Sequence, residues 1–283
     1  KQIVVSEDKK VDLKEKKEVK KVEVIKKRSS FVFPQKKPSI YKSTTKTTEK
    51  SSILNQKDFD RAKEAIQFIK DKKWNSALKS AAKVKDREFR NLITWMYLKT
   101  TRNGASFAEY KKFIEQNDDY PRINRIRYLA EEKIYLRNNS PSSIINWFER
   151  YPPLGGLGKI KLAEAYLEQG RTEKVKELIQ EGWVTAAIRK NDLGYYRAKF
   201  KKFIDSDDHI KRADYLAWEK KYWDLKRMLK YLPKDQRALY NARQILMSNS
   251  YGVDNAIAKV PQYLKEDPGL EFDRLRWRNR RGR

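Results

Sequence analysis

Residues 162–184, LAEAYLEQGRTEKVKELIQEGWV, hold two apolar stripes on either side of a polar turn. The stripes comprise Leu162, Ala163, Tyr166 and Leu167, and then Val175, Leu178 and Ile179. Spacings of three and four residues place each stripe on one face of an α-helix. Gly170 lies between the stripes, where a glycine commonly ends a helix. The stretch therefore predicts a helical hairpin.

The hairpin design recurs along the chain. It appears in residues 59–84 around the polar break Asp71-Lys72-Lys73, and in residues 216–229 around Glu219-Lys220-Lys221. A single hairpin cannot bury its own apolar face, whereas stacked hairpins can. We therefore predict an all-α fold, a superhelical and tetratricopeptide-like α-solenoid of helical hairpins. The turns are spaced too irregularly for a strict tetratricopeptide period, and no run alternates at period two for long enough to indicate a β-sheet.

The charge of the chain is unevenly distributed. Its 283 residues include 66 Lys and Arg against 38 Asp and Glu, for a formal charge of +28. Residues 1–50 hold 16 of the basic and 7 of the acidic side chains, with few large apolar ones. Such a segment cannot bury enough apolar surface to offset its ordering entropy. We predict a disordered Lys-rich tail over residues 1–55, acting as an electrostatic tether or a solvated linker, and a helical scaffold domain over residues 56–283.

Composition excludes several classes of site. The chain has no Cys and a single histidine, His209. This excludes a disulfide framework, a thiolate zinc site, a cysteine nucleophile and a multi-histidine metal site. No apolar run approaches the roughly 18 residues of a membrane span. The first residues also lack the pattern of an export signal. We predict no membrane span, no metal and no cofactor.

A glycine-rich segment, Gly155-Gly156-Leu157-Gly158-Lys159, is the one candidate for a phosphate-binding loop. That motif needs Ser or Thr after the Lys to hold Mg²⁺, and Ile160 stands there instead. Pro152-Pro153 precede the glycines and favour a turn between two helices. We therefore interpret the segment as a helix-to-helix turn.

Two acidic clusters are candidates for acid–base chemistry. Adjacent residues on a helix point in different directions, so Glu131 and Glu132 are unsuited to sharing a proton. Ser206-Asp207-Asp208 is typical of a helix N-cap and first turn, with His209 as a first-turn residue. We predict no catalytic residue from either cluster.

Aromatic and arginine-rich positions are the remaining candidates. Five tryptophans lie on or beside apolar stripes, where core packing is a more common role than stacking on sugars or bases; they are Trp74, Trp95, Trp147, Trp218 and Trp223. Residues 274–281 are dense in arginine, with Trp277 interleaved. The candidate polyanion contacts are Arg274, Arg276, Arg278, Arg280 and Arg281. The alternative interpretation is a basic helix face at a chain end.

Several segments, taken in order, resemble the amino-terminal helical region of the soluble lytic murein transglycosylases. The matching residues are Gly104-Ala105-Ser106-Phe107 with Tyr110, Phe113 and Ile114; Tyr151-Pro152-Pro153-Leu154, Gly158-Lys159 and residues 162–184; Asp208-His209-Ile210 with Arg212, Asp214 and residues 216–219; Arg237-Ala238-Leu239 with Ala242-Arg243; and Val260-Pro261, residues 267–270, Asp273-Arg274 and residues 276–278. They span about residues 56–283, and the tail has no counterpart.

The resemblance implies a periplasmic protein whose helical region is a ring-forming superhelical solenoid. In the family, a separate lysozyme-like domain cleaves the bond between N-acetylmuramic acid and N-acetylglucosamine, with an anhydro product. Its catalytic Glu lies in a Glu-Ser motif, and this chain contains no Glu-Ser pair. The helical pattern continues to Arg283, so we interpret the chain as a fragment or as a product that kept only the scaffold. We expect it to be inactive alone.

Three hypotheses for function follow. The first is a non-catalytic scaffold that holds peptidoglycan, whose carboxylates attract a cationic chain. The second is a basic helical-repeat adaptor that binds nucleic acid or a protein. The third is an assembly protein that binds a peptide on its concave face.

Overall fold

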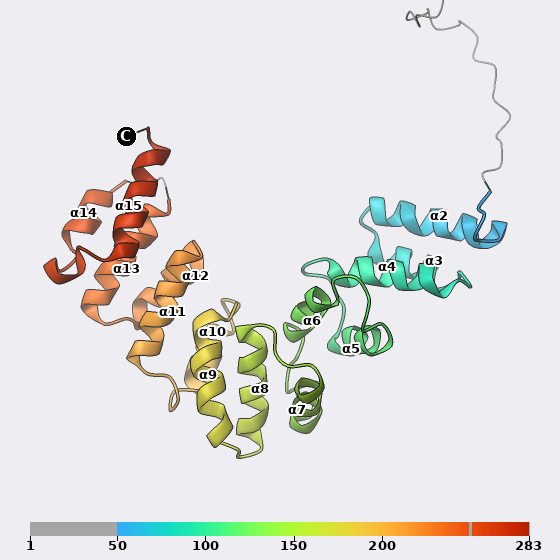
Figure 1. Ribbon diagram of the computed structural model, residues 1–283, viewed down its shortest axis with the longest axis horizontal. Helices are drawn as coiled ribbons and strands as arrows, with labels where there is room; N and C mark the ends of the chain where they lie inside the picture. The colour runs from blue at the N-terminus through green and yellow to red at the C-terminus, as the bar shows by residue number, and fades with distance from the viewer. Residues whose placement is uncertain (1–49, 249–250, 283) are drawn as a thin grey trace, which may run out of the picture. The chain divides into compact units, whose positions relative to one another are not determined.

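The computed structural model describes residues 50–248 and 251–282, most of which lie in α-helices (Figure 1). The helices are α2 (Gln56–Lys70), α3 (Trp74–Ala81), α4 (Arg87–Lys99), α5 (Phe107–Gln116), α6 (Ile123–Glu131), α7 (Pro141–Arg150), α8 (Gly156–Glu168), α9 (Glu173–Thr185), α10 (Leu193–Lys199), α11 (Ser206–Trp218), α12 (Tyr222–Met228), η1 (Leu229–Tyr231), α13 (Lys234–Leu246), α14 (Val253–Ala258), η2 (Gln262–Leu264) and α15 (Pro268–Arg280). These described ranges contain no β-strand, so the all-α prediction is confirmed. The predicted disordered tail falls on residues 1–55, of which 1–49 lie outside the described residues.

Three of the helical hairpins close with the same turn. Each turn places one residue in the left-handed region, with φ of +60° at Lys72, +73° at Gly170 and +56° at Lys220. The next backbone N–H then donates to a carbonyl five residues earlier, from Lys73 to Phe68, from Arg171 to Tyr166 and from Lys221 to Leu216. This is the Schellman arrangement that ends a helix. The glycine adopts it without strain, whereas the two lysines do so at a cost of about 1 kcal/mol each.

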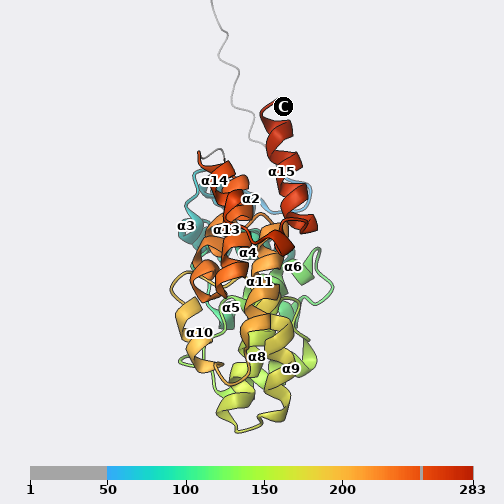
Figure 2. The ribbon, with the colours of Figure 1, turned by 90° about the vertical axis from the view of Figure 1, so that its left-hand side faces the viewer.

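Helix packing is local along the chain. The helices that pack most extensively on one another are never more than two places apart in helix order, as in α2 with α3, α9 with α11, and α13 with α15. Helices α8 and α9 lie side by side in both views (Figures 1 and 2). A Cβ on Gly182 would lie 2.9 Å from the Gly156 carbonyl oxygen, so these two backbones approach at a glycine pair.

The buried apolar residues form two clusters. The smaller one contains Ala65, Ala77, Ala81 and Ile93. The larger one runs from Tyr97 to Leu270 and includes Trp147 and Trp183. The prediction of a core role is wrong for Trp218 and Trp223, which are 45% and 64% exposed. Trp218 is the last residue of α11 and Trp223 is the second residue of α12, so both lie beside the turn between these helices. No later helix buries them as completely as it buries core residues.

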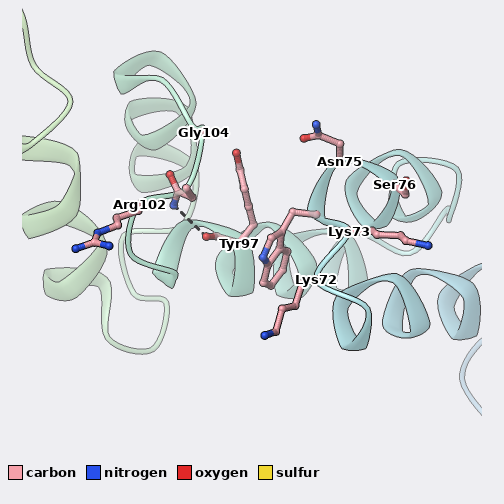
Figure 3. Close-up of a pocket in the computed structure, with 9 residues that line it drawn as sticks. Lys72, Lys73, Asn75, Ser76, Tyr97, Arg102 and Gly104 are labelled. Atoms are coloured by element: carbon pink, nitrogen blue, oxygen red, sulfur yellow. Dashed lines mark hydrogen bonds between the residues drawn. The ribbon is translucent and has the colours of Figure 1, made fainter.

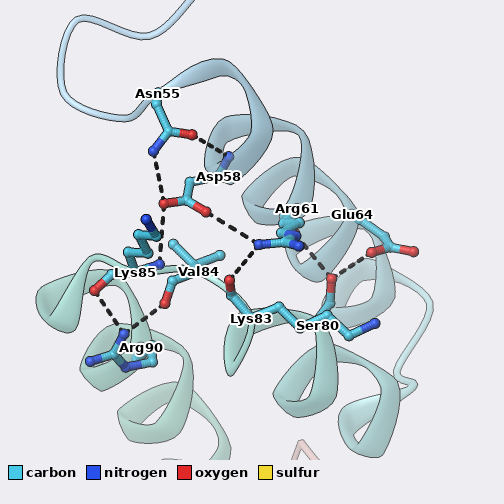
Figure 4. Close-up of polar contacts among 9 residues, drawn as sticks. All are labelled: Asn55, Asp58, Arg61, Glu64, Ser80, Lys83, Val84, Lys85 and Arg90. Atoms are coloured by element: carbon cyan, nitrogen blue, oxygen red, sulfur yellow. Dashed lines mark hydrogen bonds and ion pairs between the residues drawn. The ribbon is translucent and has the colours of Figure 1, made fainter.

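Polar contacts fix the start of α2 to the loop that follows α3 (Figure 4). The Asn55 side chain accepts a hydrogen bond from the Asp58 N–H at 3.0 Å and so caps α2. Asp58 is buried and accepts from the Lys85 N–H at 3.2 Å, while Arg61 donates to the Lys83 carbonyl at 2.7 Å. These bonds satisfy loop backbone groups that would otherwise be left without partners.

The last helix of the described chain is shorter than the sequence predicts. Helix α15 ends at Arg280, and Gly282 takes a φ of +67°, so the helix predicted to continue through Arg283 stops earlier. None of the helices formed by the described residues has both the length and the apolar character that a membrane crossing requires.

Candidate functional site

The glycine-rich segment at residues 155–159 is the start of α8 rather than the predicted turn, because only Gly155 precedes the helix, as its N-cap. The anion position at this helix start is already filled. The carboxylate of Glu131, at the end of α6, accepts hydrogen bonds from the backbone N–H groups of Leu154 at 2.5 Å and Gly155 at 3.1 Å. These groups precede the first turn of α8, where unpaired N–H groups attract an anion. The carboxylate therefore occupies the place that a phosphate would take.

The glycines of this segment make room for Glu131. A Cβ on Gly158 would lie 2.5 Å from the Glu131 carboxyl carbon, which is closer than any side chain tolerates. Glu131 is 3% exposed, and burial raises its pKa to about 7 against the opposing effect of the backbone hydrogen bonds. With both oxygens bound to backbone, Glu131 is a structural cap that joins α6 to α8.

The second acidic cluster also has a structural role. Helix α11 begins with a capping box between Asp205 and Asp208, so the N-cap is Asp205 and not Ser206. The His209 ring lies between the rings of Trp183 and Tyr231, with centroids 5.6 and 5.9 Å away. Burial lowers the pKa of His209, with Arg197 adding to the effect. These contacts make His209 a packing residue.

The five arginines predicted as polyanion contacts lie on or just after α15 but do not converge. At 100° per residue, Arg274 and Arg278 share one side of the helix, whereas Arg276 and Arg280 share a nearly opposite one. Arg280 donates to the Leu246 carbonyl at 2.5 Å. The guanidinium groups of Arg276 and Arg281 lie over the helix's own Phe272 and Trp277 rings.

A buried ion network holds α15 in place. Arg243 on α13 is fully buried, and it donates to Asp273 at 3.0 Å and to Asp214 at 2.7 Å. The N-cap residue of α15, Asp267, lies 3.8 Å from the same guanidinium group. A Cβ on Gly269 would lie 2.2 Å from the Arg243 guanidinium carbon, so the start of α15 sits directly on this group.

One cavity of about 430 Å³ carries three cations, at the end of the α2–α3 hairpin. It is lined by Lys72, Lys73 and Arg102 beside Tyr97, and its three charged ends point in different directions (Figure 3). The cavity therefore does not focus its charge on one point.

A second cavity of about 430 Å³, which we call the Tyr135 pocket, has a different construction. It is lined by Tyr135 and Arg137 from the α6–α7 loop and by Arg189, Lys190, Asn191 and Asp192 from the α9–α10 loop. Tyr135 and Arg137 also line a neighbouring cavity of about 240 Å³, together with Lys133. Three cations against one carboxylate give the lining of the Tyr135 pocket a positive balance.

A buried lysine lies next to the Tyr135 pocket. Lys161 on α8 is 3% exposed, and its Nζ lies 4.0 Å from the centroid of the Tyr135 ring and 5.2 Å from that of Tyr196. Within residues 50–248 and 251–282, no oxygen accepts a hydrogen bond from this Nζ. The nearby Glu164 instead accepts bonds from Tyr195 and Lys199.

Electrostatics around Lys161 reflect this burial. Desolvation lowers the pKa of Lys161 to about 8, Glu164 and Asp192 oppose the shift, and Arg189 and Arg137 add to it. An ammonium group that is largely buried and has no hydrogen-bond acceptor is costly to keep charged. An anion in the adjacent pocket would stabilise it.

The sequence does not single out this pocket. Lys161 lies in the run Lys159-Ile160-Lys161-Leu162, where a lysine ordinarily faces solvent. Nearly the whole surface of α8 from Ile160 to Tyr166 is buried, so the helix lacks the polar face that would reveal which charged residues are internal. The weak signal is two short basic segments, Lys133 to Arg137 and Arg189-Lys190, in loops that follow helices.

Comparison of the chain with protein-family models, with curated proteins and with solved structures finds no match.

Proposed function

We propose that the chain is the non-catalytic helical scaffold of a soluble lytic murein transglycosylase, an α-solenoid in the periplasm that holds peptidoglycan for a lysozyme-like domain. The observation that supports the solenoid part is that helices pack most extensively on near neighbours, together with three equivalent hairpin turns. The peptidoglycan part rests on the resemblance of residues 56–283 to that family's helical region.

The charge of the chain supports a polyanionic ligand of this kind. Residues 51–283 hold 50 basic and 31 acidic side chains, so the helical part remains strongly cationic without the tail. Peptidoglycan carries carboxylates on its stem peptides, and a cationic surface raises the local concentration of such a polymer.

The test is co-sedimentation of the full chain with isolated sacculi across a salt series. Binding that weakens as salt rises is expected, because exposed charges are screened within about 8–10 Å at physiological salt. A chain lacking residues 1–50 is the control for the tail and is expected to retain binding. No anhydro-muropeptide release is expected, and absence of any salt-sensitive binding contradicts the proposal.

A second candidate function is a nucleic-acid adaptor, favoured by one feature of α11 and α15. The exposed rings of Trp218 and Phe272 lie 5.4 Å apart, and Arg276 lies over Phe272. Exposed aromatic rings beside arginine are typical of surfaces that stack bases. This function would be favoured over the first if the chain binds single-stranded RNA with an affinity that falls steeply as salt rises, if Phe272→Ala abolishes that binding, and if the chain does not bind sacculi.

A further inference from the structure

The Tyr135 pocket has the features of a site built for one anionic group. Arg137, Arg189 and Lys190 line it from two different loops, so only the folded chain brings these three basic residues to one cavity. Arg137 and Lys190 are exposed and have no carboxylate partner among the described residues, while Arg189 lies 3.8 Å from Glu132 in a loose, exposed pair. Exposed pairs of this length contribute little, so all three cations are available to a ligand.

Lys161 supplies an independent sign of a ligand. Its ammonium group is buried against Tyr135, a residue of the pocket lining, and lacks a hydrogen-bond acceptor in the described chain. Contact with the faces of Tyr135 and Tyr196 recovers part of the lost hydration, but an aromatic face accepts no strong hydrogen bond. A negative charge in the pocket would complete the environment of this buried cation.

The acidic residues near the pocket favour a ligand with one negative charge over a ligand with two. Asp192 is part of the lining, and Glu132 and Glu164 lie close enough to affect the neighbouring lysines. Three carboxylates around one pocket disfavour a doubly charged phosphoryl group more than a singly charged carboxylate. The free carboxylate of Asp192 also suits a ligand that carries a donor, such as an amide N–H, beside its own carboxylate.

We propose that the Tyr135 pocket binds the terminal carboxylate of a peptide, held by Arg137, Arg189 and Lys190 above the buried ammonium group of Lys161. Asp192 accepts a hydrogen bond from the neighbouring N–H of the same peptide. This inference deepens the proposed function, since it assigns stem-peptide carboxylates as the groups of peptidoglycan that the scaffold contacts.

The probe is acetyl-alanyl-alanine with a free carboxylate, compared with the same dipeptide as its C-terminal amide, titrated against the full chain by NMR. The free acid is expected to bind. The amide is expected to bind at least about tenfold more weakly, because the amide cannot form the charge-assisted hydrogen bonds of a carboxylate. Equal binding of the two dipeptides overturns the proposal. Inorganic phosphate is a third ligand, and displacement of the acid by a lower concentration of phosphate also overturns it.

Matched double variants locate the binding. Arg137→Gln/Lys190→Gln removes one arginine and one lysine of the lining and is expected to weaken binding of the acid about tenfold or more. Arg171→Gln/Lys176→Gln makes the same change at exposed positions of the α8–α9 hairpin, outside the pocket, and is expected to leave binding within about twofold. Equal losses in the two variants would show that only net charge matters.

The titration of Lys161 is a readout that a purely structural lysine would not give. The groups that face its ammonium are Glu164 on α8, Tyr135 and Arg137 after α6, Arg189 and Asp192 before α10, and Tyr196 on α10. Bound carboxylate is expected to raise the pKa of Lys161 above about 8, and the affinity is expected to fall as pH rises past that value. A pKa that stays unchanged at saturating dipeptide contradicts the assignment.

The outcomes separate the two proposals. A chain that sediments with sacculi but does not bind the dipeptide keeps the scaffold function and loses this site. A chain that binds the dipeptide in the pocket but does not sediment keeps the site and loses the scaffold function.

Discussion

Helix α15 and the Tyr135 pocket are both basic, but they place their charges in different ways. Five arginines follow one another closely along α15 and its end, where helical geometry turns them to nearly opposite sides. The cations of the Tyr135 pocket are separated by more than fifty residues in sequence, and the fold brings them to one cavity. A dense run of charge is therefore easy to recognise in a sequence, whereas a convergent one depends on packing.

The two regions also differ in what lies beneath them. Under α15, the buried Arg243 is already paired with aspartates of the chain itself. Beside the Tyr135 pocket, the buried Lys161 has no such partner within residues 50–248 and 251–282. The first arrangement stabilises the fold, and the second leaves a charge for a ligand to satisfy.

The largest expected effect comes from breaking the network under α15. Arg243→Ala is expected to lower the free energy of unfolding by about 4 kcal/mol, because it leaves the buried Asp273 carboxylate without its partner and empties a fully buried site. Urea unfolding measures the loss, and hydrogen exchange is expected to rise first in α15. Arg237→Ala on the same helix, where the guanidinium donates to the Leu232 carbonyl, is the control. Similar losses in both variants would contradict a special role for Arg243.

The next largest effect is expected at the contact between Gly158 and Glu131, the last residue of α6 before the loop that carries Tyr135. Gly158→Ala is expected to cost about 3 kcal/mol, because the new Cβ displaces Glu131 and its backbone hydrogen bonds. Thermal unfolding measures the change. Gly194→Ala on α10 is the control, since nothing lies within 4 Å of its Cβ, and it is expected to stabilise the chain slightly. An unchanged melting temperature for Gly158→Ala would show that the Glu131 side chain can move aside without cost.

A smaller effect depends on pH and concerns Lys161 directly. Its pKa is about 8 in the folded chain against 10.5 in a solvated lysine, so the unfolded chain binds more protons between these values. Stability contributed at this site therefore rises with pH across that window. The gain in unfolding free energy from pH 7 to pH 10 is expected to be about 2 kcal/mol larger for the native chain than for Lys161→Met. Equal gains would show that Lys161 is solvated.

The smallest effect is expected on the surface of α15. Arg278 is exposed, so Arg278→Gln is expected to change the free energy of unfolding by less than about 0.5 kcal/mol. In the sacculus assay, the salt concentration that halves binding is expected to shift less than for Arg137→Gln/Lys190→Gln. A larger shift for Arg278→Gln than for the double variant would indicate that α15, and not the Tyr135 pocket, is the main basic surface that contacts sacculi.

Local features of the fold are predictable from the sequence. The breaks around Lys72, Gly170 and Lys220 are hairpin turns, as the sequence predicts. Each of these depends on residues within one turn of the break, so periodicity and turn chemistry are sufficient.

Features that depend on distant packing are not predictable in this way. Trp218 lies on an apolar stripe and is nevertheless half exposed, because no later helix covers it fully. Glu131 and Lys161 are charged residues on helices, and ordinary patterns assign them to solvent. Their burial follows from the close approach of α6, α8 and the α9–α10 loop. No local motif in the sequence encodes that approach.

Glu131 has a consequence for competition between ligands. Its carboxylate is tethered to the chain within reach of the α8 N-terminus, so it acts as a ligand at high effective concentration. A free anion in solution must displace it and also fill the space between Gly155 and Gly158 that the carboxylate occupies. The tethered Glu131 carboxylate thereby closes the anion position at the glycine-rich segment. In the Tyr135 pocket, the chain's own carboxylates are Asp192 and the Glu132 that pairs loosely with Arg189, and Arg137 and Lys190 have no ion pair among the described residues.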